Sequence, residues 1–196
     1  MADFFDIIDV NNKIKYDNLV DFISNNRMTD FFTASKHPYL VGKELYDGQM
    51  NKREGMTNTS TMMFKAADLR REIQSLESSN TVVSSNPGIS KSLYVLNKSN
   101  DSYDRTPNEI SVGRASFNDI TIADYVISKK QAIITLFFDK YFITDLNSTN
   151  GTTVNGARIE PGEKIQIEKN AVIAFGRYSF IFTHAMDLYQ RVKESE

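Results

Sequence analysis

The sequence predicts a mainly β fold, an antiparallel sandwich or barrel, with helical segments outside it. The second half of the chain consists of short apolar runs rich in β-branched and aromatic residues. Turn residues separate these runs, and no helix-length periodic stretch interrupts them until the C-terminal end. Short strands that follow one another without intervening helices are typical of antiparallel sheets.

The predicted strands begin near Leu93. Turn residues such as Pro161-Gly162-Glu163 divide neighbouring runs, because Pro and Gly favour backbone angles that end a strand. The predicted ranges are 93–96, 110–112, 120–122, 132–138, 141–146, 164–167, 172–175 and 178–182. The segment 98–107 is predicted as a long polar loop, and no role follows from its residues.

Helical spacing marks the two ends of the chain. Leu19, Phe22 and Ile23 share one face of a short helix, for which Asp17 is the predicted N-cap. This face is expected to pack against the rest of the chain, and a partner-binding amphipathic segment is the alternative. A short extended segment follows and is broken at Gly42. The C-terminal helix is predicted from the spacing of Met186, Leu188, Tyr189 and Val192.

A hydroxyl-rich stretch lies in the middle of the N-terminal half and includes Thr57, Thr59 and Thr61. An apolar stripe with helical spacing follows it, formed by Met62, Ala66, Leu69, Ile73 and Leu76. The threonines suit helix capping and loop solubility, or alternatively phosphorylation. The next residues are rich in serine and contain Pro87-Gly88, which predicts a linker.

The chain of 196 residues is long enough to bury a core. We expect a partly helical N-terminal extension at 1–76, a Ser-rich linker at 77–92, a β domain at 93–183, and a C-terminal helix and tail at 184–196.

Composition excludes several classes of function. The formal charge of −2, without any block of Lys or Arg, argues against nucleic acid as a partner. The absence of cysteine excludes disulfides, thiolate metal sites and cysteine nucleophiles. No apolar run reaches the ~18 residues that span a bilayer, so we expect a cytoplasmic protein without membrane insertion. The two histidines stand far apart and no catalytic motif occurs, so neither an enzyme nor a cofactor or metal is expected.

The most informative stretch is 145–156, Asp-Leu-Asn-Ser-Thr-Asn-Gly-Thr-Thr-Val-Asn-Gly. Its composition suits a tight loop between two strands, because Gly and Asn tolerate positive φ and short polar side chains bond the local backbone. Such a loop can also present donors to a ligand. Other polar segments accompany it, namely Gly113-Arg114, Asn118-Asp119-Ile120, 127–133 and Phe175-Gly176.

In this order and at these intervals, the segments resemble the forkhead-associated (FHA) domain, whose pattern reads G-R, N-D-I, S-R-x-H, S-x-N-G-T, V-N-G, F-G. The resemblance covers about half the chain, from near Leu93 to Thr183. It implies an FHA-type antiparallel β-sandwich with its functional loops at one end. The sequence departs from the pattern in one block, with Lys129 where many members have arginine and Gln131 where the family has histidine.

The resemblance implies a role for each matching position. The phosphate of a phosphothreonine would be contacted by Arg114, Ser128 and Lys129, whereas the phosphate or the adjoining peptide backbone would be gripped by Thr149 and Asn150. Supporting positions are Gly113 for backbone geometry, Gln131 as the brace in place of histidine, and Asn155 as a structural or peptide-contacting residue. Lysine retains the charge of arginine but not its planar fork, so a looser pocket is expected.

The resemblance therefore implies a phosphothreonine-binding signalling adaptor whose partner is a Thr-phosphorylated protein, such as a Ser/Thr kinase or its substrate. The alternative is a structural or assembly subunit that uses a degenerate FHA sandwich without phosphate. A second resemblance concerns 58–69, which is similar to the phosphoacceptor segment of short actinobacterial FHA regulators. It implies a bacterial regulator that docks its own phosphorylated N-terminal segment and so inhibits itself.

Overall fold

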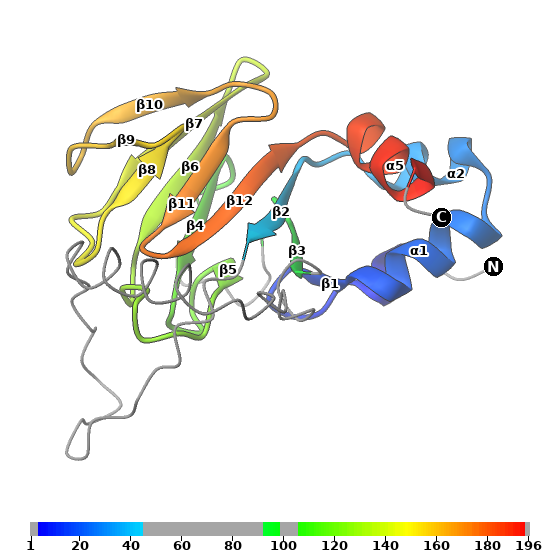
Figure 1. The fold of residues 1–196 in the computed structure, drawn as a ribbon, viewed down its shortest axis with the longest axis horizontal. Coiled ribbons are helices and arrows are strands. Elements are labelled where there is room, and N and C mark those ends of the chain that lie inside the picture. Colours follow the sequence, from blue (N-terminus) through cyan, green and yellow to red (C-terminus); the bar gives the residue numbers. More distant parts are fainter. Residues whose placement is uncertain (1–3, 45–91, 99–105, 195–196) are drawn as a thin grey trace, which may run out of the picture.

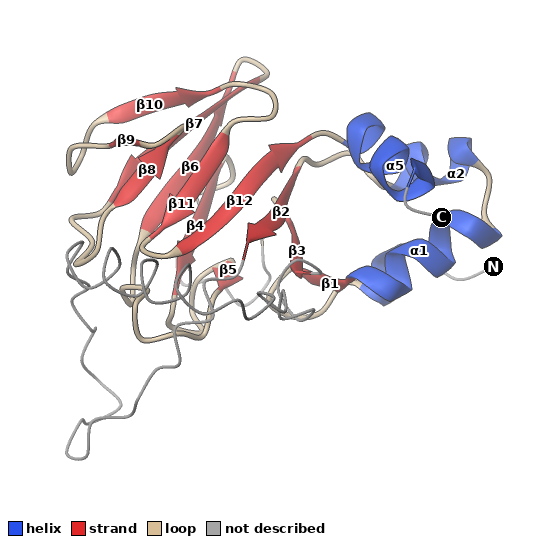
Figure 2. Ribbon diagram, in the orientation of Figure 1, coloured by secondary structure: helices blue, strands red, loops and turns tan. Residues whose placement is uncertain are grey.

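The computed structural model describes residues 4–44, 92–98 and 106–194, which form two β sheets packed as a sandwich and a group of helices at one side (Figures 1 and 2). The mainly β fold class predicted from the sequence is confirmed. One sheet has the strand order β10-β7-β6-β4-β5. The other has the order β1-β3-β2-β12-β11-β8-β9.

Each of the eight predicted runs corresponds to a strand whose bounds differ from it by at most one residue, whereas β1, β2, β8 and β9 lie outside these runs. The first sheet contains β4 (Glu109–Gly113), β5 (Ile120–Thr121), β6 (Ala132–Phe137), β7 (Lys140–Asp145) and β10 (Lys164–Ile167). The second contains β1 (Lys13–Lys15), β2 (Tyr39–Glu44), β3 (Ser92–Val95), β8 (Thr152–Val154), β9 (Ala157–Arg158), β11 (Val172–Phe175) and β12 (Tyr178–Thr183). Among the described residues, the paired strands are antiparallel except β4 and β5, which are parallel.

The sequence did not predict the hairpin formed by β8 and β9, which lies in and just beyond the stretch 145–156. Asn155 and Gly156 form its turn with φ values of 51° and 82°. Two successive residues at positive φ are the requirement of a tight hairpin turn, and Asn-Gly is the pair that meets it most easily. Only residues 146–151 therefore remain as a loop.

The N-terminal part of the chain contributes strands to the sandwich. β2 lies between β3 and β12, so a segment predicted as a short extended stretch forms a central strand of the larger sheet. Residues 45–91, which hold the second predicted helix and all of the predicted linker except Ser92, lie outside the described residues, and Ser92 is the first residue of β3. The division of the chain into domains stays a prediction.

The main core fills the space between the sheets. Alternate residues point inward, as in β6, where Ala132 and Ile134 are completely buried while Ile133 and Thr135 are partly exposed. From the other sheet Ile173, Phe175 and Phe180 complete the same cluster. This core holds the strands whose ends carry the functional loops.

A second core lies between the larger sheet and the helices η1 (Phe4–Ile7), α1 (Tyr16–Asn25), α2 (Met28–Ala34) and α5 (Ala185–Glu194) (Figure 1). β3 is buried on both faces, because Tyr94 points into the main core whereas Leu93 and Val95 point into the second. This explains why 93–96 is a continuous apolar run without the alternation of a half-exposed strand. Phe31, fully buried, packs at 5.6 Å from the ring of Phe4.

The predicted apolar face of α1 is confirmed, whereas in α5 only part of the predicted face is buried, because Met186 is 49% exposed. Leu19, Phe22 and Ile23 are the buried residues of α1, and Leu188 is buried in α5. The predicted cap is wrong, because α1 begins one residue before Asp17, which lies in the first turn. Its carboxylate there interacts favourably with the helix dipole. Among the described helices, none has the length and apolarity needed to cross a membrane.

Candidate functional site

The loops at one end of the sandwich are bonded to one another. They connect β4 with β5 (114–119), β5 with β6 (122–131) and β7 with β8 (146–151), and they meet the turn between β11 and β12. The amide of Arg114 donates to the carbonyl of Ser128 at 2.9 Å, and the amide of Gly176 donates to the carbonyl of Gly151 at 3.0 Å. Because backbone bonds join the loops, side chains far apart in sequence are held at one edge.

Arg114, a predicted phosphate contact, is fixed in the first of these loops. Its Nε donates to the carbonyl of Ile127 at 3.2 Å, and its Cζ lies 5.4 Å from the ring centroid of Tyr125. Stacking on an aromatic ring suits the weakly hydrated guanidinium plane. The cation is therefore placed by its surroundings rather than left to sample many rotamers.

Ser128 and Thr149 bring two hydroxyl groups together from different loops. Ser128 Oγ accepts a bond from the amide of Thr149 at 3.0 Å and lies 3.3 Å from Thr149 Oγ1. Asn150 donates from its side chain to the carbonyl of Val126 at 2.8 Å, which ties its loop to the segment 122–131. Three of the predicted contact residues thus lie at the junction of these two loops.

Lys129 is exposed beside this junction. Its carbonyl oxygen accepts a bond from Asn118 Nδ2 at 2.8 Å. Gly113 packs against this carbonyl group, because a Cβ added at Gly113 would stand only 2.4 Å from the same oxygen. The absence of a side chain at this glycine is what allows the first and second loops to approach each other.

Gln131 is completely buried beneath the loops, and its side chain bonds residues of two of them, the loop 122–131 and the loop 146–151. Its Oε1 accepts from the amide of Ser128 at 3.0 Å. Its Nε2 lies within donating distance of three oxygens, at 2.7 Å from Ser148 Oγ, 3.0 Å from the carbonyl of Gly151 and 3.1 Å from Thr152 Oγ1. A neutral amide can satisfy both kinds of contact, because it is donor and acceptor at once.

Asp145, the last residue of β7, completes this buried network, and the sequence did not single it out as a site residue. Its carboxylate accepts from the amide of Ser148 at 2.8 Å, and from Ser148 Oγ and Thr152 Oγ1 at 2.6 Å each. The spacing Asp145 to Ser148 is that of a local side-chain-to-backbone turn, which is the signal that would have indicated it. The loop 146–151 is held from below by charge-assisted bonds.

Asn155 lies away from this junction. Its amide donates to the carbonyl of Val172 at 2.7 Å, and its Oδ1 accepts from the amide of Val172 at 2.9 Å. Val172 begins β11, whereas the loops meet the opposite end of that strand. The contacts of Asn155 therefore stabilise the β8–β9 turn. This favours the interpretation of Asn155 as a structural rather than a peptide-contacting residue.

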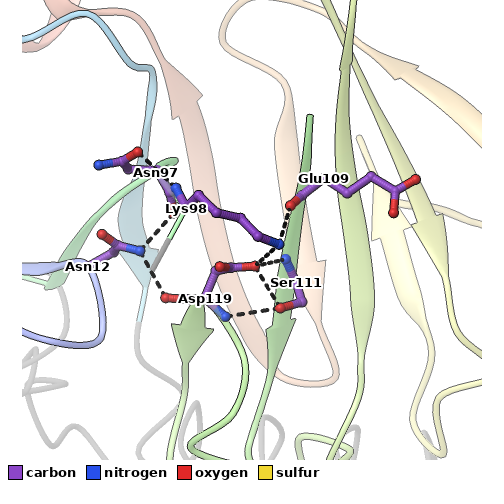
Figure 3. A network of polar contacts seen from close by, with 6 residues as sticks. All are labelled: Asn12, Asn97, Lys98, Glu109, Ser111 and Asp119. Atoms are coloured by element: carbon purple, nitrogen blue, oxygen red, sulfur yellow. Dashed lines mark hydrogen bonds and ion pairs between the residues drawn. The ribbon is translucent and has the colours of Figure 1, made fainter. Parts of the chain in front are cut away.

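Asp119 fastens the loop 114–119 to the rest of the fold (Figure 3). Asp119 is fully buried, and its Oδ2 accepts from the amide and the hydroxyl of Ser111 at 2.8 Å each and pairs with Lys98 Nζ at 3.1 Å. Asn12 Nδ2 donates to the carbonyls of Asn97 and Asp119 at 2.7 and 3.0 Å. The sequence assigned no role to Lys98 or Asn12, whose partners are distant in the chain.

A second ion pair supports the segment 122–131 from the side of β12. Arg177 lies 3.0 Å from Asp124 Oδ2, and the hydroxyl of Tyr178 also bonds this oxygen. Burial, and then the bond to Asp124, raise the pKa of Tyr178 to about 12. The phenol therefore stays neutral, and keeps its proton for this bond, throughout the physiological range of pH.

The remaining predicted positions are the three possible phosphoacceptor threonines. Thr57, Thr59 and Thr61 lie outside the described residues. Within the ranges that the structure describes, no group of three or more His, Cys, Asp or Glu side chains is arranged to hold a metal ion.

Comparisons with known proteins point to one family. The family model of the FHA domain matches residues 110–176. This range contains the five predicted contact residues of the loop junction, Arg114, Ser128, Lys129, Thr149 and Asn150. Similar solved structures include the FHA domain of the CT664 protein from Chlamydia trachomatis, with 30% identity over 46% of this chain and 83% of that chain and a TM-score of 0.38. The FHA domain of an Arabidopsis thaliana hypothetical protein has 29% identity over 50% of this chain and 77% of its own, with a TM-score of 0.41.

A third structure comes from a study of phosphothreonine-dependent FHA domain interactions. It has 26% identity over 48% of this chain and 85% of its own, with a TM-score of 0.40. The search of curated proteins found no match.

Proposed function

We propose that this chain, whose residues 110–176 form an FHA domain, is a cytoplasmic adaptor that binds a phosphothreonine segment of a partner protein through the loops 114–119, 122–131 and 146–151. The observation that carries the proposal is the junction of Arg114, Ser128 and Thr149, which places a fixed cation and two hydroxyl groups at one edge of the sandwich. The proposed activity is recognition rather than catalysis.

The chemistry of the junction fits a phosphate monoester. Such a group carries about −1.5 to −2 charges and three acceptor oxygens at neutral pH, so its recognition needs cationic and neutral donors together. Arg114 supplies a guanidinium, Lys129 an exposed ammonium, and Ser128 and Thr149 supply hydroxyl groups. The threonine methyl group would add a preference of modest size, since a buried carbon group contributes about 0.8 kcal/mol.

In our proposal, the site still binds phosphate although Lys129 and Gln131 depart from the family pattern. Gln131 occupies the histidine position and bonds both the segment 122–131 and the loop 146–151. Lys129 offers a flexible point charge where many members have arginine, so we expect it to add charge but little geometric selectivity. The affinity should therefore depend mainly on Arg114.

Replacing Arg114 with alanine should weaken binding to a phosphothreonine peptide by ten-fold or more, because one charge-assisted bond contributes roughly 1.5 to 3 kcal/mol. The measurement is fluorescence anisotropy with degenerate phosphothreonine, phosphoserine and unphosphorylated peptide libraries. The matched control is Arg191→Ala, which removes an exposed arginine from α5. Thermal unfolding of both variants would separate a lost contact from a lost fold.

The partner would be a Thr-phosphorylated protein, such as a Ser/Thr kinase or its substrate. Binding that does not need the phosphate, and that survives Arg114→Ala, would contradict this proposal. The assembly-subunit alternative would then lead, with the sandwich making constitutive contacts.

A second candidate function is self-docking of the phosphorylated N-terminal half, and one observation favours it. Glu44, at the end of β2, pairs with Ser179, close to Gly176, whose amide binds the loop 146–151. β3 pairs antiparallel with β2 and begins at the same end, at Ser92. The segment that holds Thr57, Thr59 and Thr61 is therefore attached at both ends on the side of the proposed phosphate site. An intramolecular ligand acts at an effective concentration near the millimolar range.

If self-docking occurs, phosphorylation at a single threonine of this segment should reduce the hydrodynamic radius and block added phosphopeptide. Both effects should be independent of protein concentration and should vanish in Arg114→Ala. The comparison is the chain in which Thr57, Thr59 and Thr61 are alanine, treated with the same kinase. An unchanged radius with full peptide binding after phosphorylation would exclude this candidate.

A further inference from the structure

Asn12 lies far outside residues 110–176, yet its side chain bonds the backbone of a loop of the proposed site. Asn12 precedes β1, the edge strand of the larger sheet, whereas Asp119 precedes β5, the edge strand of the smaller sheet. Asn12 Nδ2 donates to the carbonyl of Asp119 at 3.0 Å and to that of Asn97 at 2.7 Å (Figure 3). One amide group therefore joins the edges of the two sheets.

The turn that carries Asn12 holds its side chain in this position. Asn12 is only 6% exposed and has a φ of 57°, a conformation that asparagine adopts more readily than most residues. The carboxylate of Asp9 accepts from the amides of Asn11 and Lys13 at 2.8 and 2.9 Å. The carbonyl of Asn12 accepts from the amide of Val95 at 2.8 Å. The two side-chain bonds use both N–H groups of the amide, so the buried donor is fully satisfied.

The contacts of Asp119 divide between its side chain and its backbone. Its carboxylate bonds Ser111 and Lys98, and these contacts fix the side chain. Asn12 instead bonds the carbonyl, and so fixes the peptide group between Asp119 and Ile120, the first residue of β5. β5 has two residues and lies at the end of its sheet, so this bond adds a support on the side away from β4.

The backbone at Asp119 is linked to the donors of the proposed site. Asp119 ends the loop that Arg114 begins. Asn118, which precedes Asp119, donates from its side chain to the carbonyl of Ala115 at 2.7 Å and to that of Lys129 at 2.8 Å. A shift of the chain at 118–119 would therefore move the residue after Arg114 and the backbone of Lys129 together.

We propose that Asn12 is a positioning residue for phosphothreonine binding, because it holds the loop 114–119 in the conformation that presents Arg114. This inference rests on the proposed function, since it concerns the same site. It extends the binding unit to the N-terminal part of the chain, which the match to the FHA family model does not include.

The test replaces Asn12 with glycine. Glycine adopts positive φ without strain, so the substitution removes the side-chain amide and leaves the turn its conformation. Binding to the degenerate phosphothreonine peptide library, measured by fluorescence anisotropy, should weaken about five-fold. This is the low end of the coupling found between linked sites, because other bonds also hold the loop. Asn170→Gly makes the same change at an exposed position with a φ of 63° and should leave the affinity unchanged.

Two further readouts separate positioning from a general loss of stability. In the Arg114→Ala background, Asn12→Gly should weaken binding less than in the wild-type chain, because there is no guanidinium left to position. Hydrogen exchange should quicken at the amides of Asn118 and Ile122, which donate to carbonyls at 115 and 113. The amide of Gly176, which donates to the carbonyl of Gly151, should keep its wild-type rate.

Wild-type affinity in Asn12→Gly would overturn the proposal, as would an equal loss in the two Arg114 backgrounds. A similar loss in Val192→Ala would also overturn it, because that variant removes buried apolar atoms from α5, in the second core, and lowers only stability. All binding is measured where urea denaturation shows each variant to be folded. Failure of the proposed function looks different, because the wild-type chain would then bind no peptide in a phosphate-dependent way.

Discussion

Replacing Gln131 with glutamate should lower the free energy of unfolding by about 3 kcal/mol, although the two side chains have nearly the same shape. The substitution places a carboxylate oxygen where Nε2 now faces Ser148 Oγ, the carbonyl of Gly151 and Thr152 Oγ1, all within 3.1 Å. Each buried polar group left without a donor costs about 1 to 3 kcal/mol. The position is completely buried, so water cannot replace the lost donor.

The measurement is urea denaturation of the variant beside Gln190→Glu, which makes the same chemical change at an exposed position of α5. Peptide binding should fall with stability, because Gln131 also holds the amide of Ser128. The loss of stability should be smaller at acidic pH, where the introduced carboxyl group is protonated and can donate one bond. A loss below about 1 kcal/mol at neutral pH would show that the amide is not the brace that these contacts indicate.

Replacing Asp119 with alanine should lower the free energy of unfolding by about 3 to 5 kcal/mol, the size found when one partner of a buried ion pair is removed. The side chain is fully buried and accepts bonds from the amide and hydroxyl of Ser111 and from Lys98 (Figure 3). Lys98 keeps a bond to the carbonyl of Glu109 at 2.8 Å, which limits the penalty on its charge. The two Ser111 donors lose their charged acceptor outright.

Chemical denaturation would measure this loss, with Asp21→Ala on the exposed side of α1 as the matched control. The double variant with Lys98→Met should be less destabilised than the sum of the two single variants, because removing both charges leaves neither one unpaired. Additive losses would mean that Lys98 and Asp119 do not stabilise each other.

The residues of the loop junction were predictable because their chemistry is local and their spacing matches a known pattern. Arg114, Ser128 and Thr149 stand beside strands whose apolar runs mark their bounds, and the structure brings these residues to one edge. The sequence also indicated that Gln131 would support these loops, because it stands at the histidine position of the pattern. The partners of its Nε2 were not predictable, since they lie 17 to 21 residues further along the chain.

Other features escaped prediction because their local signal is weak. β8 (Thr-Thr-Val) and β9 (Ala-Arg) are very short and are joined by the turn Asn155-Gly156, so the sequence of this hairpin resembles that of a loop. The segment that forms β2 was predicted only as a short extended stretch. Its pairing with β3 and β12 places it inside the larger sheet. A strand acquires its position from its hydrogen-bonded neighbours, and a sequence does not state which strands those are.

The sequence by itself determined the mainly β fold class, the amphipathic faces of α1 and α5, and the order of the polar segments that became the loop junction. These features follow from periodicity and turn chemistry over a few residues. The tertiary structure alone decided that Asn12 bonds partners 85 and 107 residues away, and that Lys98 neutralises Asp119. Such contacts arise only when folding brings distant segments together, because a buried polar group takes whichever partner the packed strands place beside it.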